Sequence, residues 1–125
     1  MSYDLCLRDP NTGEAVKLQA RHQWRGGTYA VGGCDTASFN VTYNYAHILQ
    51  RVLGEKGICE LYGKTGAMTF DLLSKAIAEL TAAVELNGDG VSNDYWEATS
   101  GNVKHALMVL LDLAVMCPEG VWNGD

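Results

Sequence analysis

Residues 102–116 read NVKHALMVLLDLAVM and contain most of the longest apolar stretch of the chain. Apolar side chains cover so much of the circumference that this segment is predicted to be the most buried helix. Thr99 or Ser100 is expected to cap its start, and Cys117–Pro118 to close it. The apolar positions are Val103, Leu107, Leu110, Leu111, Ala114 and Val115. Only Lys104, His105 and Asp112 mark a solvent side.

Two more helices are predicted before this segment. From Asn44 onward apolar residues take up helical spacing, and Gly54 is placed to end that helix through a left-handed cap. A longer helix is expected from near Thr69 to Leu86, where residues 87–90, NGDG, stop it. Its apolar stripe is Phe70, Leu73, Ile77, Leu80 and Val84.

The N-terminal part of the chain carries strand patterns. Residues 3–8 alternate between apolar and polar, residues 9–13 read DPNTG, a strong turn signal, and residues 15–20 alternate again. This predicts a β-hairpin. Ser38 to Tyr43 is β-prone and is expected to be a third strand or the lead into a helix. The chain is therefore predicted to be a single α+β domain over residues 1–125, with an N-terminal antiparallel β-hairpin or small sheet packed against three helices.

Composition excludes several classes of protein. With 125 residues, 47% of them hydrophobic, the chain is a globular domain large enough to bury a core. A net charge of −6 argues against a nucleic acid polymer as partner. The N-terminus lacks the pattern of a secretory signal, and the longest apolar stretch is too short to cross a bilayer, so no membrane association and a cytoplasmic location are expected.

The best candidate binding segment is residues 21–33, RHQWRGGTYAVGG. Arginine and histidine side chains can pair with phosphates, Trp24 or Tyr29 can stack on a base, and glycines let the backbone N–H groups approach a ligand. The alternative is a hairpin in which Trp24 is core and the arginines are solvated. The predicted ligand-binding residues are Arg21, His22, Trp24, Arg25, Gly26, Gly27 and Tyr29, with Tyr43, Asn44 and Tyr45 completing the pocket.

Three other possible motifs lack a required residue or a defining pattern. Gly63-Lys64-Thr65 resembles the end of a P-loop, but Ile58 stands where the first glycine belongs. Residues 85–90 resemble the start of a calcium loop, but Trp96 occupies the position of the bidentate glutamate. Cys34 with His22 or His47 has no local pattern that would fix a catalytic pair. We therefore predict no catalytic residue, no cofactor and no metal.

Several segments resemble a group of small proteins found in phage and prophage genomes. They are residues 25–33 (RGGTYAVGG), 40–45 (NVTYNY), 52–58 (VLGEKGI), 95–99 (YWEAT) and 120–125 (GVWNGD). The resemblance transfers no activity. By analogy with small acidic phage proteins that inhibit host defence, it implies sequestration of a nucleotide immune signal in the pockets of a symmetric oligomer.

The sequence thus favours a non-enzymatic, phage-type protein that binds a small anionic or nucleotide-like ligand and forms a homo-oligomer. Trp122 and Trp96 are large aromatics in predicted loops, and both are expected at the subunit interface. The alternative is packing in the core, which is the default for Trp96 and which Trp122 would reach if the tail docked as a strand. The first alternative is an inhibitor or adaptor that covers a host protein with its acidic surface and exposed aromatics. The second alternative is an enzyme that degrades a nucleotide.

Overall fold

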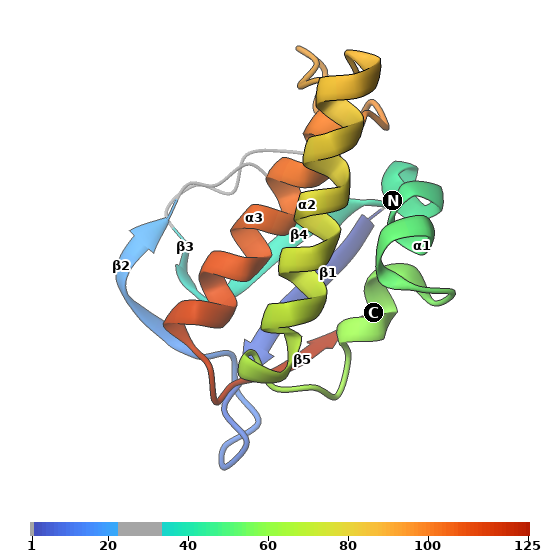
Figure 1. Cartoon of the computed structure of the whole chain (residues 1–125). Helices are drawn as coiled ribbons and strands as arrows, with labels where there is room; N and C mark the ends of the chain where they lie inside the picture. The colour runs from blue at the N-terminus through green and yellow to red at the C-terminus, as the bar shows by residue number, and fades with distance from the viewer. Residues whose placement is uncertain (1, 23–33) are drawn as a thin grey trace.

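The computed structural model describes residues 2–22 and 34–125, with the backbone alone for residues 19–22 and 34. Figure 1 shows a small sheet with helices laid across one of its faces. The strands are β1 (Ser2–Arg8), β2 (Lys17–His22), β3 (Cys34–Thr36), β4 (Ser38–Thr42) and β5 (Val121–Gly124). The α-helices are α1 (Ala46–Leu53), α2 (Phe70–Asn87) and α3 (Ser100–Met116), and the 3-10 helices are η1 (Tyr43–Tyr45), η2 (Gly57–Leu61) and η3 (Ala67–Thr69).

β1 is the central strand of an antiparallel sheet with the order β4-β1-β5. Along one edge Tyr3 pairs with Val41, and along the other Leu7 pairs with Trp122. β2 and β3 form a separate two-stranded ribbon. The α+β fold class, with a small antiparallel sheet packed against three helices, is confirmed.

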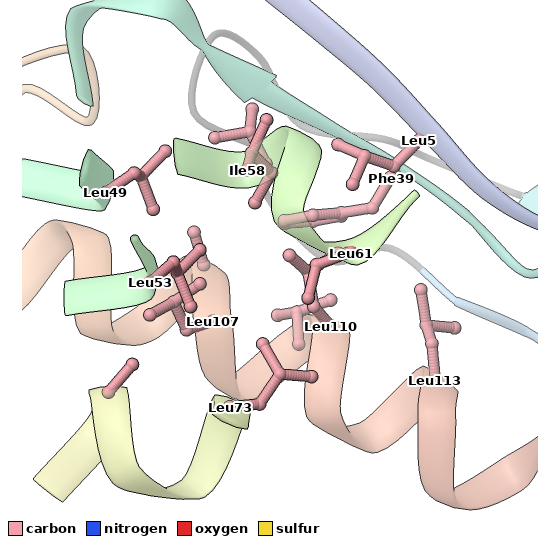
Figure 2. Close-up of a cluster of buried hydrophobic side chains, with 14 of the residues drawn as sticks. Leu5, Phe39, Leu49, Leu53, Ile58, Leu61, Leu73, Leu107, Leu110 and Leu113 are labelled. Carbon is pink, nitrogen blue, oxygen red and sulfur yellow. The ribbon is translucent and has the colours of Figure 1, made fainter. Parts of the chain in front are cut away.

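The core lies between the sheet and the helices. Alternate residues of β1 and β4 turn their side chains inward, as the period of a strand requires, and Leu5 and Phe39 are buried there. Figure 2 shows these two side chains meeting Leu61 of η2, with leucines of α2 and α3 beyond it. The helices are therefore held to the sheet by packing of aliphatic and aromatic side chains.

The predicted hairpin is only partly correct. The turn forms as expected, because the Gly13 N–H donates to the Asp9 carbonyl at 2.8 Å and one bridge joins Arg8 to Ala15. Beyond that bridge β2 leaves β1 and pairs with β3. Both edges of β1 are occupied instead by β4 and β5, which bring their own apolar faces to the core.

The two long helices are confirmed to within a few residues. The hydroxyl of Thr99 accepts the N–H of Asn102 at the start of α3, and Gly88 ends α2 in the left-handed conformation with φ 66° and ψ 20°. One position on α3 differs, because Val115 is exposed rather than packed. No helix in residues 2–22 and 34–125 is long and apolar enough to cross a membrane.

The first helix ends where expected, but its cap is of another kind. η1 precedes α1, and the Thr42 hydroxyl accepts the Asn44 N–H at that junction. Gly54 follows α1 with φ 131° and ψ 176°, which is outside the left-handed helical region, so the predicted cap is wrong. Its φ of 131° favours glycine there, whereas a Cβ would meet only the flexible side chain of Glu60.

The expected interface role of Trp122 is wrong. Its side chain is 0% exposed, and its indole N–H donates to the hydroxyl of Thr69 at 3.0 Å. The C-terminal tail forms β5, which joins the sheet and places Trp122 opposite Leu7. Its place near the end of the sequence does not reveal this burial. A buried indole N–H requires a partner, and Thr69 supplies it.

Replacing Thr69 with valine should therefore destabilise the protein. The change keeps the shape of the side chain but removes the bond from the Thr69 hydroxyl to the Gly66 carbonyl at 2.8 Å and leaves the buried indole N–H of Trp122 without an acceptor. The unpaired indole N–H alone costs about 1–3 kcal/mol. Thr81→Val is the matched control, because the Thr81 hydroxyl donates to the Ile77 carbonyl on α2 and is only half-buried. Urea unfolding of both variants measures the difference. Equal stability of the two variants would contradict a structural role for the indole bond.

Candidate functional site

A cleft of about 400 Å³ opens between α1 and α2 and reaches the first turn of α3. In Figure 1, α1 lies to one side of α2, and the two helices provide the opposing walls. The volume falls in the range of sites for small molecules. The lining residues are His47, Ile48, Arg51, Val52, Glu79, Leu80, Ala83, Asn87, Asp89, Ala98 and Ser100.

The α1 wall presents a histidine and an arginine. His47 and Arg51 are four residues apart, which places both on one face of the helix, and both are exposed. The neighbouring positions Ile48 and Val52 are buried in the core and fix the orientation of the helix. The amphipathic pattern of α1 therefore directs these two polar side chains to the cleft.

The opposite wall comes from α2 and the residues after it. Glu79, Ala83 and Asn87 recur at intervals of four and line the cleft from α2. Leu80 is buried and, with Ile48 and Val52, forms an apolar floor. The cleft thus combines a basic wall, an apolar floor and a wall of acidic and amide groups.

Asp89 closes one end of the cleft and holds the start of α3. Its carboxylate accepts the Ser100 N–H at 2.7 Å, and its carbonyl accepts the Gly101 N–H at 2.9 Å. The pKa of Asp89 lies below its usual range. The largest cause is the hydrogen bond from the backbone N–H of Ser100, and the Ser100 hydroxyl and the charge of Arg51 contribute less. Asp89 is therefore a carboxylate with its orientation fixed by the protein.

The N-terminus of α3 has no free donor for an anion. Besides the two bonds to Asp89, the Asn102 N–H donates to the Thr99 hydroxyl and the Thr99 N–H to the Glu97 carbonyl. All four N–H groups that a helix leaves unpaired at its start are thus satisfied within the chain. Any attraction of the cleft for an anion must come from Arg51 and His47.

Asn44 and Tyr45, predicted as ligand-binding residues, make their hydrogen bonds within the chain. The Asn44 amide donates to the Trp96 carbonyl at 3.0 Å, and the Tyr45 hydroxyl donates to the Tyr95 carbonyl. Burial raises the pKa of Tyr45 to about 12, so its hydroxyl stays protonated. Both side chains hold the loop that precedes α3. Their role toward a ligand stays a prediction.

Tyr43 lies apart from these two residues. Its ring packs edge-on against Tyr3 with centroids 4.5 Å apart, beside the start of β1. The side chain of Tyr45, by contrast, is buried and lines a separate small pocket of about 230 Å³ with Tyr95 and Asn102. The structure therefore does not bring Tyr43 and Tyr45 together in one pocket.

Most of the predicted arginine and aromatic site lies outside the described residues. This holds for Trp24, Arg25, Gly26, Gly27 and Tyr29, and for the side chains of Arg21 and His22. The flanking strands are described, and His22 pairs with Cys34 across the β2–β3 ribbon. The two ends of the segment thus lie side by side.

Trp96 remains available at the surface, whereas Trp122 does not. Trp96 is 49% exposed, and its ring packs edge-on against Tyr95 at a centroid distance of 5.2 Å. Its expected role at a subunit interface stays a prediction.

Arg51 and Glu79 were not predicted as site residues, and His47 was considered only beside a cysteine. The signal in the sequence is the spacing of four between His47 and Arg51, on the face opposite the apolar stripe. That spacing is common on solvated helices, so by itself it does not indicate a site. It does so only together with the position of α1 beside α2. Within the described ranges, no three His, Cys, Asp or Glu residues gather as a metal site requires.

The chain matches no protein-family model, no curated protein and no solved structure.

Replacing Asp89 with alanine should lower stability in a pH-dependent way. The variant loses the bond to Ser100, a cost of about 1–2 kcal/mol at neutral pH. Because folding lowers the pKa of Asp89, its contribution is present above the ordinary value of 3.8 and is lost as the pH falls through the lower, folded-state value. The difference from wild type should therefore shrink in acid.

Urea unfolding as a function of pH measures this effect. Asp94→Ala is the control, because the Asp94 carboxylate holds no backbone N–H of a residue in 2–22 or 34–125. A stability loss in the Asp89 variant that is the same at every pH would contradict the charged cap.

Proposed function

We propose that the protein binds a small nucleotide-like anion in the cleft between α1 and α2, without transforming it. The observation that carries the proposal is the α1 wall, where Arg51 and His47 stand exposed above an apolar floor. Neither side chain forms an ion pair with a carboxylate in the described part of the chain, although Arg51 is near enough to Asp89 to lower its pKa. A guanidinium in this position can bind a phosphate through two parallel hydrogen bonds.

The rest of the cleft suits the other half of a nucleotide. A planar base can lie against the half-buried Ala83 and Ala98 and the small exposed part of Val52. The Asn87 amide and the Glu79 carboxylate on the opposite wall can accept hydrogen bonds from the N–H groups of a base. A ligand with an anionic end and a neutral, hydrogen-bonding end matches this distribution of charge better than a simple anion does.

The wider role remains part of this proposal. Sequestration of a nucleotide immune signal by a phage-encoded homo-oligomer in the cytoplasm is what the resemblance implies. The arginine and aromatic segment is a second candidate for the anion. The backbone pairing of His22 with Cys34 supports this second site, because it places β2 and β3, the strands that flank the segment, next to each other.

Native mass spectrometry of the purified protein tests the proposal first, followed by denaturing release and calorimetric titration with linear and cyclic adenine and guanine nucleotides. Arg51→Gln should weaken binding at least about tenfold, since a hydrogen bond to a charged group contributes about 1.5–3 kcal/mol. Arg8→Gln is the matched control, because Arg8 lies on β1 and is not part of the cleft.

The outcomes separate the two candidate sites. Loss of affinity in Arg51→Gln with normal affinity in Arg25→Gln supports the cleft. Loss of affinity in Arg25→Gln with normal affinity in Arg51→Gln supports binding at the arginine and aromatic segment instead. A protein that retains no nucleotide and binds none in the panel is not a nucleotide-binding protein.

A further inference from the structure

Three large apolar side chains project into solvent where α2 ends and in the loop that follows. The exposed fractions are 82% for Leu86, 76% for Val91 and 49% for Trp96. A single exposed apolar residue is ordinary on a protein surface. Three of them within residues 86–96 form a local feature that the fold alone does not require. We call these three residues the apolar tip.

The loop that carries the apolar tip is fixed by hydrogen bonds between its backbone and buried or neighbouring side chains. The Asn102 side chain is buried; it accepts the Ser92 N–H at 3.1 Å and donates to the carbonyls of Asp94 and Glu97. The Asn44 amide donates to the Trp96 carbonyl, and the Tyr45 hydroxyl donates to the Tyr95 carbonyl. The backbone polar groups of the loop thus bond inward to the protein.

α3 contacts the same loop directly. A side chain at Gly101 would overlap the backbone of Gly90 and Val91, so the loop lies against the first turn of the helix. A loop fixed in this way loses little conformational entropy when a partner covers it. Its exposed apolar groups are therefore pre-organised for contact.

The surroundings of the apolar tip are acidic. Between Lys75 and Lys104 the chain has no lysine or arginine. The same interval carries three carboxylates outside the cleft, from Glu85, Asp94 and Glu97, and two that line the cleft, from Glu79 and Asp89. This charge repels anionic lipid headgroups and nucleic acid, and it would place acid against acid if a second copy docked through the same face.

We propose that the apolar tip and its acidic rim form a docking surface for a basic segment of a partner protein. Apolar residues of the partner cover Leu86, Val91 and Trp96, while its lysine or arginine side chains meet the rim. An apolar centre with a charged rim is the usual composition of a protein–protein contact. The surface is separate from the wall of the cleft that Arg51 and His47 provide.

The test uses the full chain and two synthetic helical peptides of equal length, one patterned with leucine and lysine and the other with leucine and glutamate. NMR titration of the labelled protein follows the amide signals. The leucine–lysine peptide should shift signals of residues 84–98, and its binding should weaken as salt is raised. The leucine–glutamate peptide should not bind.

A pair of double variants makes the test specific. L86S/V91S should weaken binding of the leucine–lysine peptide at least about tenfold, the effect expected for the loss of anchor residues. M68S/V115S is the matched control, because it removes two exposed apolar side chains from η3 and α3 and should leave affinity unchanged. Both variants change exposed positions, and their amide spectra report whether each is folded.

Three results would overturn the proposal. They are shifts that map to another surface, equal weakening in both double variants, and a homodimer that L86S/V91S abolishes. Nucleotide binding should be the same in L86S/V91S as in wild type. Failure of the docking surface and failure of the cleft are therefore distinguishable.

Discussion

The side chain of Trp122 connects the parts of this fold that are farthest apart in the sequence. Its indole N–H reaches Thr69 at 3.0 Å, its backbone N–H donates to the Lys64 carbonyl at 2.9 Å, and its carbonyl accepts the Gly63 N–H at 3.0 Å. The same residue pairs with Leu7 in the sheet. One buried residue thus joins β1, β5 and the connection into α2, and these bonds add to the apolar packing that holds the helical layer to the sheet.

The position of β5 determines the rest of the strand order. Once β5 occupies one edge of β1, the other edge is left for β4, and β2 and β3 pair with each other in a ribbon whose base, at Val16 and Ala37, bonds to the backbone of Leu7. β4 leads through η1 directly into α1, so α1 begins at the end of the sheet and lies beside α2. The cleft that holds Arg51 is therefore a consequence of sheet topology, although none of its lining residues belongs to a strand.

Sequence patterns predict the two long helices well because each shows its own periodicity and has a capping residue close to it, Gly88 at the end of α2 and Thr99 at the start of α3. They do not predict the sheet order, since β5 pairs with β1 through Trp122 and Leu7, which are 115 positions apart and share no local signal. The same limit applies to function. Asn44 and Tyr45 stand out as polar residues at a helix start, but only the structure shows that they hold residues 95 and 96.

The charge on the two walls of the cleft has two different origins. Asp89 is present because α3 needs an acceptor for the Ser100 N–H, and its carboxylate is already occupied by that bond. Arg51 has no comparable structural duty, since its side chain is exposed and no described carboxylate lies within ion-pair distance. The Asp89 carboxylate keeps its negative charge, so it and Glu79 oppose an anion that the Arg51 guanidinium attracts through paired hydrogen bonds, and the balance of these local charges decides whether an anion binds. The acidic composition of the chain as a whole therefore does not determine which ligand this cleft attracts.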